Sequence, residues 1–100
     1  MVAQRETAAT MKHNKTTYDA ANGITIFHFE NGRTMKLWNN TRQVWYLNGK
    51  LHREDGPAAI DPNGTKRWYL NGKRHREDGP AEIHADGSKR WYLNGVRQQQ

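Results

Sequence analysis

Aromatic and aliphatic residues alternate with polar ones in short runs along this chain, a pattern typical of β-strands. In an extended segment around Trp68, this residue shares one face with Leu70, whereas Arg67 and Tyr69 share the other. Asn-Gly and Asp-Gly pairs, which favour tight turns, separate the runs. The pattern predicts an all-β fold, built as an elongated antiparallel meander of hairpins.

The pentapeptide Trp-Tyr-Leu-Asn-Gly occurs three times, and its copies start 23 residues apart, at Trp45, Trp68 and Trp91. The two complete units, Trp45–Arg67 and Trp68–Arg90, are identical at 17 of 23 positions. An internal repeat of this length indicates stacked supersecondary units that bury their faces against one another. We call these two stretches the first and the second unit.

Each unit is expected to hold a long strand and a shorter one, which in the second unit are residues 66–70 and 80–83. A connection at residues 73–79 joins them. Asn and Gly tolerate the positive φ angles of tight turns. The turns are therefore expected at Asn48, Gly49, Asn71, Gly72, Asp55, Gly56, Asp78 and Gly79.

Alternation assigns the side chains to two faces. A covered face is expected to carry a spine of large apolar residues, with Ala81 beside it: Trp45, Trp68, Trp91, Leu47, Leu70, Leu93, Ile60 and Ile83. The two units differ at positions 51/74, 59/82, 61/84, 62/85, 63/86 and 65/88. We expect pairs 59/82 and 61/84 to point outward and the other four to lie in connections. The covered face would then be constant between the units.

The chain before the first unit divides into two parts. Residues 1–17 are polar and rich in helix formers, which predicts an N-terminal arm, partly helical when packed. Residues 18–44 contain a degenerate copy of the repeat, with strands expected at residues 24–29 and 34–38. Residues 45–100 hold the two full units and a truncated third. An edge strand in that third unit could pair with a second copy or be covered by residues 96–100.

The net charge of +6 is spread thinly, with acidic residues interleaved, so it does not specify a partner by itself. With no cysteine, no apolar stretch of membrane-spanning length and no secretory signal, the sequence favours a cytoplasmic protein. We find no set of residues typical of a nucleophile with its base, a phosphate loop or a metal quartet. We therefore expect no enzyme, no catalytic residue, no metal and no cofactor.

The stretches His52–Asp55 and His75–Asp78 combine histidine with carboxylates, which could bind a metal or transfer protons. Because the motif recurs in each unit, a structural role is the better interpretation. In that role Asp would cap backbone N–H groups, and Arg would pair with a carboxylate of a neighbouring repeat.

The period, the phrase Asn71-Gly72-Lys73-Arg74-His75 and the phrase Ala85-Asp86-Gly87-Ser88-Lys89 resemble MORN-type repeats. The insert Arg76-Glu77-Asp78-Gly79-Pro80-Ala81 departs from that family and looks like a variant found in repeat proteins of bacteriophages and large DNA viruses. The resemblance implies a scaffold or binding surface without enzymatic residues. It also implies a phage or viral accessory protein that binds or inhibits a host protein, including one of host defence, in the host cytoplasm.

The outward side chains form a candidate binding face, in which Tyr and Arg are the interface-forming types: Tyr46, Tyr69, Tyr92, Arg67, Arg90, Glu82 and His84. A protein partner is the favoured interpretation. Because aromatic residues beside arginine also stack on bases, binding to nucleic acid or to an anionic surface is the alternative.

Overall fold

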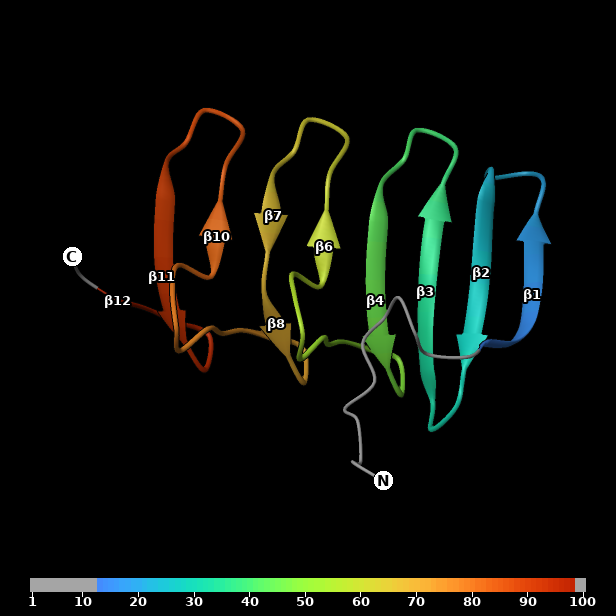
Figure 1. The fold of residues 1–100 in the computed structure, drawn as a ribbon, viewed down its shortest axis with the longest axis horizontal. Coiled ribbons are helices and arrows are strands. Elements are labelled where there is room, and N and C mark those ends of the chain that lie inside the picture. The colour runs from blue at the N-terminus through green and yellow to red at the C-terminus, as the bar shows by residue number, and fades with distance from the viewer. Residues whose placement is uncertain (1–12, 99–100) are drawn as a thin grey trace, which may run out of the picture.

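The computed structural model of the chain describes residues 13–98, which are all-β and contain no helix (Figure 1). Most of their strands form one antiparallel sheet in the order β1-β2-β3-β4-β6-β7-β10-β11-β12, with β5 paired to β4 and with β8 and β9 as a separate pair. The predicted meander of hairpins is confirmed. The strands are β1 (His13–Asp19), β2 (Ile24–Phe29), β3 (Arg33–Trp38), β4 (Gln43–Leu47), β5 (Lys50–Leu51), β6 (Ala59–Ile60), β7 (Lys66–Arg67), β8 (Tyr69–Leu70), β9 (Lys73–Arg74), β10 (Glu82–Ile83), β11 (Lys89–Leu93) and β12 (Val96–Gln98).

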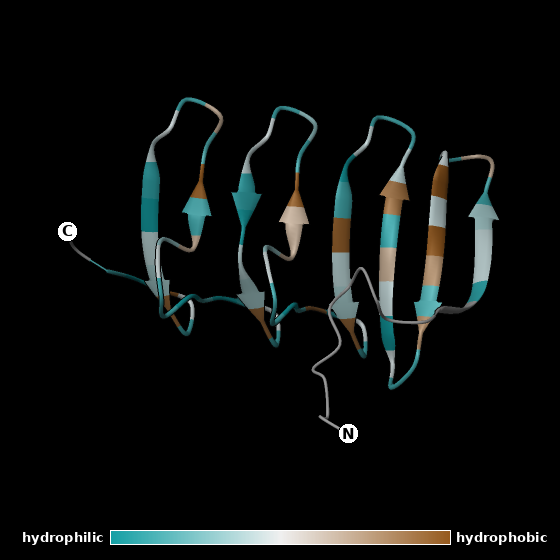
Figure 2. Ribbon diagram, viewed as in Figure 1, coloured by the Kyte–Doolittle hydropathy of each residue, from teal (hydrophilic) through white to brown (hydrophobic). Residues whose placement is uncertain are grey.

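Strands β2 to β4 form a regular ladder and carry much of the apolar colour in Figure 2, whereas β1 is more hydrophilic and pairs with β2 through a register shift between His13 and Lys15. β2 matches the strand expected at residues 24–29, and β3 begins one residue earlier than expected. β1 begins at His13, inside the segment for which we predicted an arm. Its partner β2 supplies a hydrogen-bonding edge, and this long-range effect is absent from local helix propensity. The helical arm predicted for residues 1–12 lies outside the described residues.

In the second unit the expected long strand is split at Trp68, and the reason is a change of partner. Lys66 and Arg67 pair with β6 on one side and β10 on the other. After Trp68 the chain pairs with its own return strand, β9. Trp68 lies between the two pairings, and its backbone N–H donates to the carbonyl of Ala81 (2.8 Å). The equivalent Trp45 makes the same bond to Ala58, but β4 stays unbroken because β3 pairs along its whole length.

The Asn-Gly turns are confirmed by their backbone angles. Asn48, Asn71 and Asn94 have φ values of 50°, 52° and 51°, and each is followed by a glycine with positive φ. The glycines of the pairs Asp55-Gly56 and Asp78-Gly79 have a different role, since neither has positive φ. A Cβ at Gly79 would lie 2.9 Å from the guanidinium carbon of Arg76. Here glycine permits close approach of an arginine.

The loops after β5 and β9 join consecutive rungs. The backbone N–H of Asn71 donates to Nδ1 of His52 (2.9 Å), and 23 residues later Asn94 donates to Nδ1 of His75 (2.9 Å). The residue after each histidine adds a backbone hydrogen bond to the next unit; for example, the N–H of Arg53 donates to the carbonyl of Tyr69. His52 is 8% exposed. Both histidines therefore build the array, in agreement with the structural interpretation of their motif.

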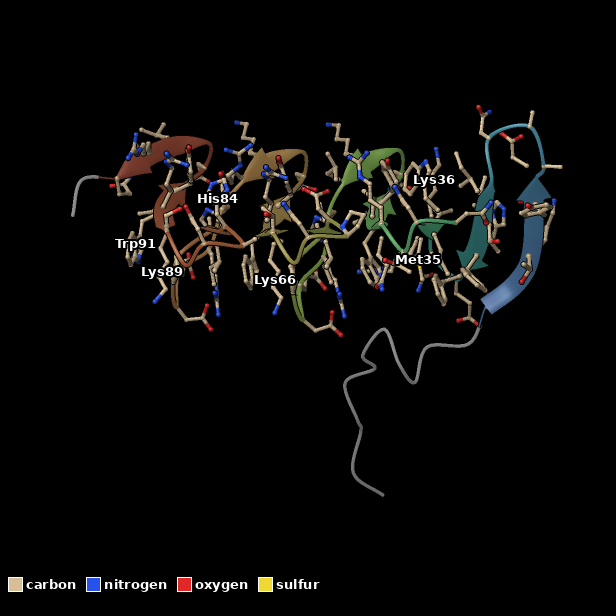
Figure 3. All side chains as sticks on the ribbon, turned by 90° about the horizontal axis from the view of Figure 1, so that it is seen from above. Met35, Lys36, Lys66, His84, Lys89 and Trp91 are labelled. Carbon is tan, nitrogen blue, oxygen red and sulfur yellow. The ribbon has the colours of Figure 1, made fainter. Side chains whose placement is uncertain are left out.

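The described sheet is one layer thick, and its burial differs from the expectation of one covered face (Figure 3). Among residues 13–98 the buried hydrophobic side chains are small, namely Val44, Ala58, Ala59 and Ala81. The spine residues are half-buried or, for Leu93, 41% exposed. A strand that is paired on both sides is shielded by its neighbours. The burial of a residue therefore depends more on the pairing of its strand than on the face that its side chain occupies.

At the end of the array, Val96–Gln98 turns back as β12 and pairs with Trp91–Leu93. Of the two expectations for this edge, a second copy or coverage by residues 96–100, the pairing agrees with the second over residues 96–98.

Candidate functional site

The two faces of the sheet carry different chemistry. We call the side of Tyr46, Tyr69 and Tyr92 the tyrosine face and the opposite side the tryptophan face. Figure 3 shows Lys36 and His84 on the former, and Met35, Lys66, Lys89 and Trp91 on the latter. The strand register places Glu82 opposite both Arg67 and Arg90, so these three side chains share a face, as predicted.

Glu82 is the centre of a charged cluster on the tyrosine face. It lies on β10 between the arginines of β7 and β11, and only 5% of the residue is exposed. Its Oε1 accepts a hydrogen bond from Arg74 Nη1 (2.8 Å) and lies 4.0 Å from Arg67 Nε. Its Oε2 lies 3.5 Å from Arg90 Nη1 and also contacts His84 Nε2. Three cations thus compensate the burial of one carboxylate.

Arg74 connects this carboxylate to the tyrosines. Its Nη2 donates to the hydroxyl of Tyr69 (2.9 Å), and its guanidinium lies 4.8 Å from the ring centre of Tyr92. Burial opposes the charge of Arg74, but the hydrogen bond to the Tyr69 hydroxyl and the charge of Glu82 outweigh it and raise the pKa of the guanidinium. Within the described residues, its Nε is buried without a hydrogen-bond partner. Arg74 is therefore held in place at some energetic cost.

Six of the seven residues predicted for the binding face come together in this cluster: Tyr69, Tyr92, Arg67, Arg90, Glu82 and His84. Tyr46 lies on the same face one unit earlier, where Lys36 Nζ is 5.2 Å from its ring centre.

The sequence prediction missed Arg74, the residue that links the others. We placed pair 51/74 in a connection, whereas Arg74 lies on β9 opposite Tyr69. One signal could have identified it. Pairs 51/74 and 59/82 change together, from Leu and Ala in the first unit to Arg and Glu in the second.

The first unit has no such cluster at the equivalent place. Leu51 lies opposite Tyr46, and Ala59 lies opposite Arg67, as Arg74 and Glu82 do one unit later. The position of His84 is taken by Asp61, which accepts a hydrogen bond from Arg67 Nη1 (2.9 Å). Three of the six sequence differences between the units therefore lie close together on the tyrosine face.

On the tryptophan face, arginines of the His-Arg-Glu-Asp loops stack on the spine. The guanidinium of Arg76 lies 4.1 Å from the ring centre of Trp68, and Arg53 lies 3.9 Å from that of Trp45. Arg76 Nε also donates to Asp78 (3.1 Å) in its own loop. We expected these arginines to pair with a neighbouring repeat, and this was wrong. The Asp-Gly turn brings the carboxylate back within reach of its own arginine.

Chemically, the cluster is suited to binding. Each of its arginines already lies near a carboxylate, and the histidine contacts the same group. In residues 13–98, His, Asp and Glu form no group of three or more placed to hold a metal ion. The tyrosines and the aliphatic parts of the arginines form a contact surface over paired charges.

The part of the chain that the structure describes has no helix of sufficient length and apolarity for a membrane span. No protein-family model matches the chain, and searches of curated proteins and of solved structures gave no match either.

Proposed function

We propose that this chain is a non-enzymatic, protein-binding repeat module, and that the cluster of the second unit is the centre of its binding surface. The observation that carries the proposal is the convergence of two tyrosines and three arginines around Glu82 on an open sheet face. Tyr and Arg dominate the energetics of protein interfaces. Here their conformations are fixed by mutual contacts, so less side-chain entropy is lost on binding.

The pairing of charges favours a protein over a nucleic acid. Affinity for a nucleic acid comes chiefly from cations that neutralise phosphates. In the cluster, Arg74 and Arg90 share Glu82, and Arg67 contacts Asp61 at 2.9 Å. These carboxylates reduce the positive charge that the arginines offer to a phosphate chain. A protein surface with its own mixture of charges and apolar groups fits better.

The resemblance to MORN-type repeats supports a more specific form of the proposal. In that form the chain is a phage or viral accessory protein that binds, and inhibits, a protein in the host cytoplasm. The resemblance depends on the repeated Asn-Gly-Lys and Asp-Gly phrases, and the cluster would give this particular chain its specificity.

The test is a pull-down with the tagged chain from lysate that has been treated with nuclease and washed at high salt. One stoichiometric protein that survives the wash is the expected result. Recovery of nucleic acid alone, lost on nuclease treatment, would replace the proposal by the alternative.

A pair of variants locates the binding surface. Tyr92→Ala removes a ring of the cluster, and Tyr46→Ala removes a ring of the same type on the same face, away from it. A hot-spot tyrosine contributes about 2 kcal/mol or more to binding. We expect Tyr92→Ala to weaken binding of the recovered protein by at least about 30-fold, and Tyr46→Ala to weaken it much less. Equal effects would place the surface elsewhere.

A further inference from the structure

A groove on the tryptophan face lies outside the cluster. It runs between two consecutive His-Arg-Glu-Asp loops, one from each unit, and has a volume of about 590 Å³. Its apolar part is formed by Trp68 and Leu70. Sites of this volume commonly hold a ligand or the side chains of a bound segment.

The groove has an acidic rim in a chain of positive net charge. Its acidic lining residues are Glu54, Asp55, Glu77 and Asp78, against the two arginines of the same loops. The side chains of Glu77 and Asp78 are 83% and 88% exposed, and that of Glu54 is 62% exposed. The rim therefore presents carboxylates to solvent, and Glu54 also lies 3.4 Å from Arg33 Nη2, as Glu77 lies 3.6 Å from His75 Nε2.

The two arginines of the rim are already engaged. Arg53 donates to Asp55 (2.9 Å) and to the carbonyl of Pro57 (3.1 Å). Arg76 donates in the same way to Asp78 and to the carbonyl of Pro80 (3.0 Å). Arg76 lies over the ring of Trp68 in the groove, at 4.1 Å from its centre, and Arg53 lies over Trp45, at 3.9 Å. The contact of Arg76 shows that a guanidinium is accommodated next to the indole and a carboxylate of this groove.

We propose that this groove binds an extended, cationic segment of a partner protein, with arginine or lysine side chains at Glu54 and Glu77 and apolar side chains on Trp68 and Leu70. Charge complementarity selects this occupant. A second copy of the chain fits less well, since the arginines of its tyrosine face are paired with Glu82 and Asp61. The groove is a second binding surface, opposite in face and in charge to the one proposed above.

The test uses the full chain and two fluorescein-labelled octapeptides, one alternating arginine with leucine and the other alternating glutamate with leucine. Fluorescence anisotropy at low salt should show saturable binding of the arginine peptide and none of the glutamate peptide. Each exposed ion pair changes affinity by a small factor, so Glu54→Gln with Glu77→Gln should weaken binding by about three- to tenfold.

Glu30→Gln, which removes an exposed carboxylate outside the groove, is the matched control and should leave peptide affinity unchanged. The glutamine substitutions at Glu54 and Glu77 also separate this proposal from the previous one, because they alter the groove and not the cluster. Circular dichroism should show that the double glutamine variant is folded. Equal affinity of the wild type and this variant, or equal binding of both peptides, would overturn the proposal. So would a concentration-dependent dimer that the double glutamine variant abolishes, since the occupant would then be a second copy.

Discussion

The first and second units share a backbone plan and differ in what they place on the tyrosine face. In both, a tryptophan lies under a loop arginine, and a histidine accepts the N–H of the next turn asparagine. On the other face, Leu51, Ala59 and Asp61 of the first unit are replaced by Arg74, Glu82 and His84 of the second. The residues that the units share hold each unit to the next, and the residues that differ form one cluster on the tyrosine face.

This difference indicates how a repeat array can acquire a site without a change of fold. Replacing Ala by Glu at a position that is 7% exposed in one unit and 5% exposed in the other would by itself bury a charge. The replacement of Leu by Arg at the paired position supplies a partner at 2.8 Å. Either replacement alone would destabilise the fold more than both together, so we infer that the two are energetically coupled.

The largest expected effect concerns what the units share. Trp68→Ala should lower the free energy of unfolding by about 3 kcal/mol, because it removes a large half-buried ring and the contact with Arg76. Trp45→Ala should cost about the same, since Arg53 stacks on that ring in the same way. Urea denaturation gives both values. A loss below about 1 kcal/mol for either would mean that the ring is not part of the spine.

The next effect concerns what the units do not share. Glu82→Ala should lower the free energy of unfolding by about 2 kcal/mol, because three arginines lose a common carboxylate. The triple variant Arg74→Leu, Glu82→Ala and His84→Asp gives the second unit the residues of the first at these three positions. It should recover to within about 1 kcal/mol of the wild type, because a paired buried charge can be replaced by apolar residues. In it, the new carboxylate at position 84 would pair with Arg90 as Asp61 pairs with Arg67.

Thermal and urea denaturation of the single and triple variants would measure this coupling. Additive losses, with the triple variant less stable than Glu82→Ala, would mean that the three positions are independent.

The smallest expected effect concerns the turns. Asp86 Oδ1 accepts hydrogen bonds from the Ser88 hydroxyl and backbone N–H, which lower the pKa of Asp86 below 3.8. A lowered pKa means that ionised Asp86 contributes stability above pH 3.8, and this is lost as the pH falls through the folded-state pKa. Asn63 holds the equivalent turn of the first unit without titrating.

Asp86→Asn should therefore remove a small part of the acid sensitivity and leave neutral stability nearly unchanged. Urea midpoints of the two chains, measured from pH 6 down to about pH 3, give the comparison. Parallel loss of stability in both chains would show that Asp86 makes no contribution.

The sequence predicted those features that depend on neighbouring residues. The Asn-Gly turns follow from the positive φ that these residues tolerate, and alternation places Tyr69 and Glu82 on one face. The break at Trp68 was not predictable in this way, because it reflects which strands pair with the residues on either side of it. The burial of Glu82 also depends on three arginines from three strands, which alternation alone does not bring together.

The most direct test of the central claim is the affinity of the captured partner for the triple variant, measured by titration beside the wild type. The account predicts a folded variant of nearly unchanged stability whose affinity falls at least about 30-fold, since the contact surface of the second unit is replaced by that of the first. A folded triple variant that binds the partner as tightly as the wild type would contradict it.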